Sequence, residues 1–283
     1  MNKNLSEVIV CECGGEYRSN METLTCESCG RHVPLENGIP LFTLPPENIQ
    51  PSRKVTRGPN LGTPWRQANW RFLADEIARI PADALILDVG AGRGDFSDVL
   101  AAYRTLALDV YPYPEVDLVC DLTRTNPFRP LSVDVIVLLN VLEHVYDAHT
   151  LLATLSEILK PGGKLLVTVP FMVKMHQVPL DFARYTHYAL TRFAADHGFV
   201  VERLDGYYDP AFLLDEGLGN LRWAVLRELS RERRLVVYFA LGIFALGRWI
   251  LPHALGSAAQ RTISPANTFS QSPTGYHIVY RKQ

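Results

Sequence analysis

Three glycines that closely follow an apolar run could shape a turn that holds a ligand. The run 85–87 leads through Asp88 to Gly90, Gly92 and Gly94. Because glycine has no side chain and readily adopts a positive φ, the backbone there can turn sharply and lie directly against a bound molecule. A helix that starts after the turn would point its first N–H groups at the same place. The pattern predicts a site for a nucleotide-like ligand, or else a tight strand-to-helix turn without one.

Polar side chains end three further apolar runs. Asp109, Asp121 and Asn140 each close such a run. Asp109 comes about twenty residues after the glycine turn, where an acid in a nucleotide-binding sheet meets the ribose hydroxyls. Because ligands bind beyond the carboxyl ends of parallel strands, we expect these side chains to gather at one edge of a sheet.

Four of the five cysteines lie close together near the N-terminus. Cys11 and Cys13 form a C-x-C pair, and Cys26 and Cys29 form a C-x-x-C pair. Two tight turns that each present two sulfurs can make a tetrahedral S₄ site, which favours one structural zinc ion. A redox dithiol or free thiols are the alternative. His32 is then a bystander, because four thiolates already fill the coordination shell.

The elements that must position these groups alternate between strands and helices. Helices are predicted at 65–80, where Trp70, Leu73, Ile77 and Ile80 would form one apolar face, at 96–103, in the residues that begin with Glu143 and His144, and at 187–198. Strands are predicted at 85–89, 105–109, 116–122, 134–140, 164–170, 199–204 and 275–282. This order predicts an α/β doubly wound, Rossmann-like sheet of seven strands, the last of them antiparallel.

Five motifs in this order resemble the class I S-adenosylmethionine-dependent methyltransferases. They are LDVGAGRGDF, LALDVY, CDL, LNVLEHV and LKPGGKLLVTVP. The resemblance covers roughly residues 70–205 and the closing strand. It implies that S-adenosylmethionine is the cofactor and that the protein transfers methyl groups. The glycine spacing differs from the G-x-G-x-x-G of a dehydrogenase, which counts against a nicotinamide cofactor.

The resemblance also implies which residues hold the cofactor. Asp88 and the three glycines would surround its methionine part, and Asp109 would hold its ribose hydroxyls. Asp121 and Leu122 would frame the adenine, and Asn140 would face the sulfonium and the substrate. The full cofactor set is Asp88, Gly90, Ala91, Gly92, Gly94, Asp109, Val110, Asp121, Leu122 and Asn140.

The cysteine pairs and the segment 34–42 together resemble the small Trm112-like zinc domain that is fused to, or partners, methyltransferases. We therefore expect a zinc ribbon at 1–45 with Cys11, Cys13, Cys26 and Cys29 as ligands. A linker rich in Pro, Asn and Gly follows at 46–64. The methyltransferase domain is expected at 65–283.

The segment after the fifth strand carries the candidate groups for substrate chemistry. His176 could act as a general base for an acceptor hydroxyl, with Asp181 to orient it and Tyr185 to line the pocket. Arg184 could hold an anionic or glycan part of the substrate, or pair with Asp181. Phe171 is a further substrate candidate, and His144 is either a proton carrier or a structural histidine. The alternative is a loop whose polar groups satisfy one another.

Residues 206–274 form an unusually long insertion before the last predicted strand. It contains the apolar run 235–247, followed by Arg248 and then Trp249-Ile250-Leu251. The run is shorter than the roughly twenty residues that span a bilayer. Three readings stay open for the hydrophobic helix at 235–251: burial within the protein or at a homodimer contact, peripheral contact with a membrane or lipid-linked substrate, and a true span.

The composition constrains the partners. There are 28 basic and 30 acidic residues, without a long run of one sign, which counts against a protein that binds nucleic acid along its backbone. The N-terminus lacks the apolar core of a secretory signal, so we expect a cytoplasmic protein, either free or peripheral to the inner face of the membrane. The favoured acceptor is a small molecule or a glycan- or lipid-linked compound, methylated on a hydroxyl oxygen. The alternatives are an RNA methyltransferase and a non-catalytic, cofactor-binding partner protein.

Overall fold

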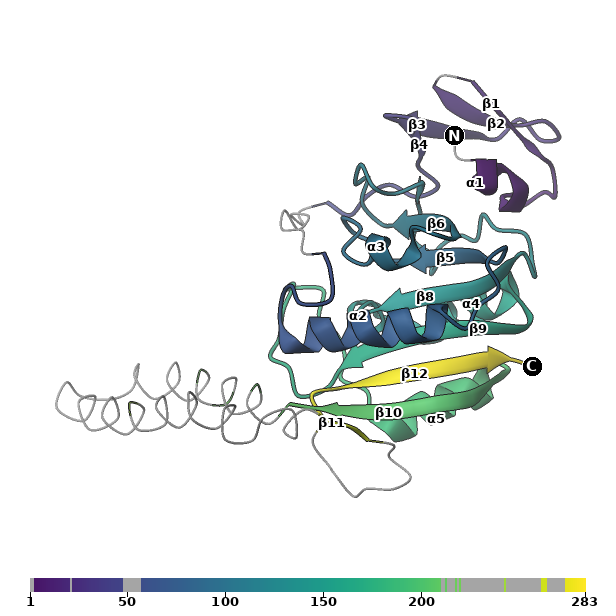
Figure 1. The fold of residues 1–283 in the computed structure, drawn as a ribbon. Helices are drawn as coiled ribbons and strands as arrows, with labels where there is room; N and C mark the ends of the chain where they lie inside the picture. Colours follow the sequence, from purple (N-terminus) through teal and green to yellow (C-terminus); the bar gives the residue numbers. More distant parts are fainter. Residues whose placement is uncertain are drawn as a thin grey trace.

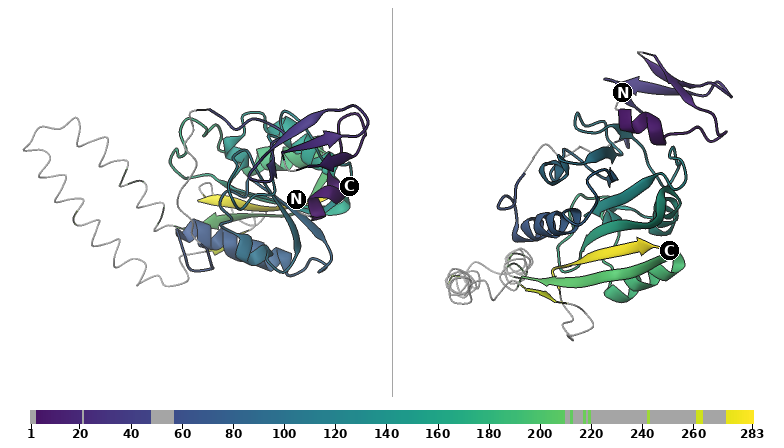
Figure 2. Two further views of the ribbon diagram at one scale, coloured as in Figure 1. Left: turned by 90° about the horizontal axis from the view of Figure 1, so that it is seen from above. Right: turned by 45° about the vertical axis from the view of Figure 1, so that its right-hand side comes forward.

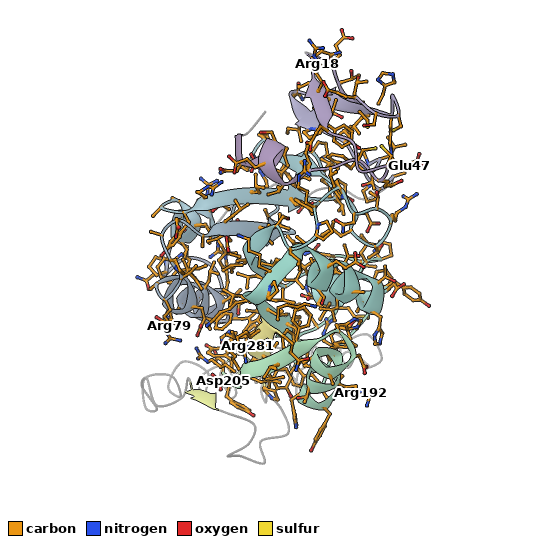
Figure 3. The ribbon with its side chains drawn as sticks, turned by 90° about the vertical axis from the view of Figure 1, so that its right-hand side faces the viewer. Arg18, Glu47, Arg79, Arg192, Asp205 and Arg281 are labelled. Carbon is orange, nitrogen blue, oxygen red and sulfur yellow. The ribbon has the colours of Figure 1, made fainter. Side chains whose placement is uncertain are left out.

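The computed structural model describes residues 3–20, 22–47, 57–209 and 273–283, with β11 (Arg261–Ile263) and a few isolated positions. A small N-terminal unit lies at one end of a large sheet (Figure 1). Arg18 on the small unit and Arg192 on helix α5 (His187–Asp196) lie at opposite ends of the described part of the structure (Figure 3). The large sheet is the part that positions the candidate site.

The large sheet has the predicted α/β architecture. Its strands lie in the order β11-β10-β12-β9-β8-β5-β6-β7. The strands from β5 to β9 run parallel, and β12 is antiparallel to both of its neighbours. Their bounds are β5 (Leu85–Val89), β6 (Arg104–Asp109), β7 (Leu118–Val119), β8 (Val133–Leu139), β9 (Leu159–Pro170), β10 (Phe199–Tyr208) and β12 (Gly275–Lys282). The seven predicted strands are therefore present, and β11 adds a short eighth at the β10 edge.

Alternating residues of the central strands build two cores, one on each face of the sheet. Helices α2 (Pro64–Ile77) and α3 (Ser97–Leu100) cover the face that holds Ile86, Val135 and Val137. Helices α4 (Ala148–Ile158) and α5 (His187–Asp196) cover the face that holds the neighbouring residues of the same strands. The views in Figure 2 show these two helical layers. Successive residues of a strand point to opposite faces of the sheet, and helices cover both faces here. Every position in the strand is therefore buried, which explains the continuous apolar runs in the sequence.

Two helix predictions need correction. The helix expected at 96–103 is the single turn α3, and the turn 142–144 is a separate 3₁₀ helix, η1 (Leu142–His144). Helix α4 begins only at Ala148, because the side chain of Asp147 caps it by accepting a hydrogen bond from Thr150 N. Glu143 and His144 therefore lie before this helix and do not begin it.

The buried face of α2 agrees with the prediction only in part. Leu73 and Ile77 are buried as predicted, and Trp65, Asn69 and Glu76 are buried beside them, whereas Trp70 is only partly buried and donates a hydrogen bond to Asp98 at 2.9 Å. The pattern was misread because polar residues occupy two of the buried positions. The helix also ends earlier, at Ile77.

The N-terminal unit docks on the edge of the large sheet. It consists of α1 (Lys3–Val8), β1 (Tyr17–Ser19), β2 (Thr23–Cys26), β3 (His32–Glu36) and β4 (Ile39–Pro40). Leu41 forms a parallel bridge with Val119 of β7, and Phe42 N donates to the Val119 carbonyl at 2.9 Å. Leu5 and Ile9 are buried in the same core as the sheet. The contact covers the backbone groups of an edge strand that would otherwise be free.

The hydrophobic helix predicted at 235–251 lies outside the described residues, as does most of the insertion 206–274. Within the described part of the chain, every helix is too short or too polar to cross a bilayer.

Candidate functional site

A cavity of about 420 Å³ opens beyond the carboxyl ends of β5, β6 and β8. Every residue predicted to hold the cofactor lines this cavity except Gly94. His144 lines it as well, together with Gln177 and Leu180 from the segment that joins β9 to α5. We call this segment, residues 171–186, the β9–α5 loop.

The glycine turn has the open backbone that the sequence indicates. Gly90 has a φ of 74°, and a Cβ there would lie 2.4 Å from a methyl group of Val141, so no larger residue fits. Gly92 has a φ of 56°, and a Cβ there would meet no atom within 4 Å. Gly92 N donates to the Asp109 carboxylate at 2.9 Å. The turn is therefore held by the acid at the end of β6 and leaves free space beside it.

Two buried carboxylates face this space. Asp88 and Asp109 are each only 8% exposed. Burial raises the pKa of Asp88 to about 7, and the charge of Asp109 adds to the shift. Burial likewise raises the pKa of Asp109, although N–H groups of Tyr111 and Gly92 oppose the change. A cationic ligand would stabilise the ionised form of both carboxyls and lower their raised pKa values. The residues therefore fit S-adenosylmethionine, which carries positive charge on its sulfonium and amino groups.

Asn140 ends β8 and is held in place from two sides. Its Oδ1 accepts hydrogen bonds from Trp65 Nε1 at 3.0 Å and from Asn69 Nδ2 at 3.3 Å. Asn69 Oδ1 in turn accepts from His277 Nε2 at 2.9 Å. His277 is stacked between Trp65 and Phe72, and burial lowers its pKa to about 3. A chain of hydrogen bonds thus runs from a neutral core histidine to the cavity wall.

His144 has a fixed orientation. Its Nδ1 lies 2.5 Å from the Leu180 carbonyl, and because a carbonyl can only accept, Nδ1 carries the proton. Its Nε2 is buried and has no hydrogen-bond partner among the described residues. Burial lowers the pKa of His144, so the imidazole is neutral near pH 7. The neighbouring Glu143 is fully buried, and burial raises its pKa to about 8.

The β9–α5 loop brings His176 against His144 but keeps it out of the cavity lining. The two rings are edge to face with centroids 4.7 Å apart. His176 N donates to the Asp181 carboxylate at 2.8 Å. The guanidinium of Arg184 donates to both oxygens of Asp181, at 2.5 and 2.8 Å, and holds the pKa of that carboxyl well below its usual range. The loop is therefore organised around the Asp181–Arg184 ion pair, one of the two alternatives for Arg184.

Two other predicted substrate residues lie away from the cavity. The Tyr185 ring packs on Phe193, and its hydroxyl is 3.5 Å from the Leu142 carbonyl. Phe171 packs edge on against Tyr276. The structure therefore places His144 in the cavity wall. Tyr185, Phe171 and Arg184 lie behind the wall and pack against the elements that form it.

Several lining residues were missed by sequence reasoning. Arg66, Tyr111, Tyr113, Thr123, Gln177 and Leu180 all contribute to the cavity wall. Arg57 also supports the glycine turn, by donating to the carbonyls of Gly94 and Arg93. The spacing of Trp65 and Asn69, one helical turn apart, was a readable signal, because a buried asparagine on an apolar helix face needs a polar partner.

The four N-terminal cysteines converge. Cys11 and Cys29 sulfurs are 3.7 Å apart, Cys13 and Cys26 sulfurs are 3.5 Å apart, and all four lie within 4.8 Å of one another. Sulfurs bound to one tetrahedral zinc ion at 2.3 Å are about 3.8 Å apart. The donor set therefore fits a closed S₄ zinc site of structural type, with no open position for a substrate.

The N-terminal unit also reaches the cofactor cavity. Asp121 N donates to Thr43 Oγ1 at 2.9 Å. A second cavity, of about 370 Å³, lies between residues 44–47 and the group formed by Val110, Asp121 and Arg124. Val110 and Asp121 line both cavities, and the segment 43–47 that leaves the N-terminal unit passes beside the predicted adenine end of the site.

Known proteins resemble this chain over the same region. Residues 65–204 match the family model Methyltransf_23, described as a methyltransferase domain. A Mycolicibacterium smegmatis protein named "Probable S-adenosylmethionine-dependent methyltransferase" is 28% identical over 192 residues, which cover 60% of this chain and 75% of the relative. The demethylmenaquinone methyltransferase of Tropheryma whipplei is 26% identical over 182 residues, covering 56% and 76% of the two chains.

Among solved structures, a SAM-dependent methyltransferase from Archaeoglobus fulgidus aligns with a TM-score of 0.48 and 14% identity, over 77% of this chain and 94% of that one. The family match, the named relatives and the cavity of glycines and acids agree on one conclusion. The chain therefore contains a class I S-adenosylmethionine-dependent methyltransferase domain that includes residues 65–204.

Proposed function

We propose that this enzyme transfers the methyl group to a hydroxyl oxygen of a small-molecule or lipid-linked acceptor. The observation that carries the proposal is the position of His144 in the cavity wall, with a neutral imidazole and an Nε2 that has no hydrogen-bond partner. A hydroxyl must lose its proton as it becomes a nucleophile, so it needs such a group beside it.

The chain's own residues would position the cofactor. Asp88 and the glycine turn would hold its methionine part, Asp109 its ribose, and Asp121 with Leu122 its adenine. The bound cofactor supplies an electrophilic methyl carbon, so the protein has to align the acceptor with that carbon and exclude water. Asn140, fixed by Trp65 and Asn69, would set the wall at which the two reactants meet.

The acceptor hydroxyl would be ionised at the wall formed by η1 and the β9–α5 loop. Leu180 of the loop fixes the His144 ring, and Phe182 N donates to the Glu143 carbonyl at 2.9 Å. These contacts tie the loop to η1, and Gln177 and Leu180 close the cavity beside the imidazole. The loop thereby shields the reacting groups from bulk water.

The outer surface of the same loop suits an apolar acceptor body. Met175, Val178 and Phe182 are 78%, 73% and 44% exposed, and the exposed Tyr146 ring packs edge on against Phe182. Apolar side chains that gather in this way beside a polar cavity favour a molecule with a hydroxyl-bearing head and an apolar remainder. Of the two relatives, one is named for demethylmenaquinone and the other for no acceptor, so the acceptor class is argued from the cavity.

Transfer of isotope-labelled methyl groups tests the proposal. The enzyme is incubated with ¹³C-methyl S-adenosylmethionine and with aqueous or detergent-solubilised extracts, and the product's carbon chemical shift identifies the atom that received the methyl. We expect a methyl ether, with His144→Gln slowing turnover at least a hundredfold while cofactor affinity changes little. Methylated nitrogen or carbon, or full activity of His144→Gln, would contradict the proposal. His187→Gln, at a half-buried histidine at the start of α5 and outside the cavity lining, is the matched control.

A further inference from the structure

Three potential metal ligands converge beside the cavity wall. Oε1 of Glu143 lies 3.6 Å from Nε2 of His144 and 3.9 Å from Nε2 of His176. The three ligand atoms all lie within 4.8 Å of one another. Atoms that bind one ion at 2.0–2.2 Å are about 3–4 Å apart. A small contraction of the group would therefore place all three around a common centre.

Among the described residues, the carboxylate of Glu143 has no hydrogen-bond partner that would explain its burial. The residue is 0% exposed, and in that part of the chain no group donates a hydrogen bond to either carboxylate oxygen. The guanidinium of Arg184 donates instead to both oxygens of Asp181 and to loop carbonyls. A buried carboxylate without a partner is costly, and a bound cation is one of the arrangements that removes the cost.

The two imidazoles are turned so that their lone pairs face this carboxylate. The proton of His144 is on Nδ1, which donates to the Leu180 carbonyl. Nδ1 of His176 lies 3.3 Å from the Asp181 carboxylate and 3.3 Å from the Lys174 carbonyl, both of them acceptors. Each Nε2 is therefore free to bind an ion. Metal-binding histidines characteristically donate their other ring N–H to a carbonyl or a carboxylate, as both do here.

We propose that Glu143, His144 and His176 bind a divalent transition-metal ion. Two imidazoles and one carboxylate suit zinc, iron or manganese better than magnesium or calcium, which prefer oxygen ligands only. Three protein ligands leave coordination positions open. Because His144 lines the cavity, these positions face the place where the acceptor would lie.

The metal site would take part in the proposed function, and this role rests on the proposal that the acceptor is a hydroxyl. A hydroxyl oxygen bound to a divalent ion has a lower pKa and loses its proton to water. The oxygen then forms a bond to the methyl carbon while the carbon–sulfur bond breaks, and that electron pair stays on sulfur. With the ion present, the imidazole of His144 serves as a ligand, and the proton goes to solvent.

Manganese binding tests the site without a substrate. The full chain, shown by metal analysis to hold only the one zinc ion of the cysteine site, is titrated with Mn²⁺, and free Mn²⁺ is measured by electron paramagnetic resonance. The cysteine site is a poor competitor, because thiolates favour softer ions. We expect one Mn²⁺ per chain, at least a hundredfold weaker binding in Glu143→Gln and in His176→Gln, and partial retention in Glu143→Asp. His187→Gln, which removes a half-buried histidine outside the cluster, should bind as wild type does.

The outcomes separate this proposal from the proposed function. A wild-type chain that binds no Mn²⁺, or variants that bind it unchanged, would overturn the metal site and leave the His144 imidazole as the proton acceptor. A chain that binds Mn²⁺ through these residues but methylates nitrogen or carbon would keep the site and overturn the acceptor. If Glu143→Gln does not fold, the half-buried His176→Gln decides, with S-adenosylmethionine binding as the check of folding.

Discussion

The indole Nε1 of Trp65 lies 3.0 Å from Oδ1 of Asn140 and joins the first helix of the methyltransferase domain to the tip of β8. Asn140 has a positive φ of 53°, an unfavourable backbone for a residue other than glycine. The contacts from Trp65 and Asn69 hold the side chain in this position. The helix before the sheet therefore has a direct part in shaping the cavity.

Replacing Trp65 by phenylalanine should loosen the position of Asn140 in the cavity wall while leaving the core packed. The smaller ring keeps its packing against Tyr207 and His277 but has no N–H to donate to Asn140. The loss of one such hydrogen bond costs about 1 kcal/mol, so we expect turnover to fall roughly five- to tenfold. Steady-state kinetics measures the effect, and an unchanged rate would show that Asn140 keeps its position without the indole.

The raised pKa of Asp88 should make cofactor binding depend on pH. The carboxyl must ionise to attract the cationic cofactor, and its pKa in the free protein is about 7, above the ordinary value of 3.8. Affinity should therefore rise from pH 6 to pH 8, by up to about tenfold per unit below pH 7, and then level off. Isothermal titration calorimetry measures this, with proton release visible in buffers of different ionisation enthalpy. The Asp88→Asn variant should bind weakly with a much flatter pH profile, and a steep profile in it would assign the effect to another group.

The buried His277 should make the fold sensitive to acid. Its pKa falls from 6.5 to about 3 on folding, so the folded state favours the neutral ring. The associated stability is complete above about pH 6.5 and is lost as the pH falls, by about 1.4 kcal/mol per pH unit. Urea unfolding at pH 7 and pH 5.5 measures the slope. In His277→Gln, the free energy of unfolding should change less with pH, by that amount per pH unit. An equal pH dependence in both proteins would show that a group other than His277 causes it.

Zinc removal should unfold the N-terminal unit and leave most of the cofactor affinity. Chelation or Cys26→Ser removes the ion that closes the S₄ site, so amide exchange should become fast in β1–β4. The glycine turn, Asp88 and Asp109 belong to the large sheet, and Thr43 Oγ1 supports the site by accepting one hydrogen bond from Asp121 N. We expect cofactor affinity to fall by less than about tenfold. Stoichiometric metal analysis that finds no zinc in the native protein would reject the site itself.

The predictable parts of this protein are those that local chemistry determines. Strands β5, β8 and β12 were readable because each is a continuous apolar or alternating run between clear turn signals. The glycine turn was readable because few other residue types tolerate its backbone.

The remaining features depend on partners that are distant in the chain. Asn69 is acceptable in a core only because His277, 208 residues later, donates to it. Nothing near Leu41 indicates that it pairs with Val119, because that bridge depends on how two folded units meet. The approach of His176 to Glu143 likewise follows from the path of the β9–α5 loop, which the Asp181–Arg184 ion pair fixes. Motif spacing contains no information on these relationships.

The central claim is that acids and open backbone at the ends of β5 and β6 bind S-adenosylmethionine, and its most direct test is calorimetric titration of Asp109→Ala. The variant loses both the predicted ribose contact and the carboxylate that holds Gly92 N. Asp196→Ala, which removes a surface partner of Arg192 on α5, is the matched control. We predict at least a hundredfold loss of affinity in Asp109→Ala and none in the control. Wild-type affinity in a folded Asp109→Ala protein would contradict the account.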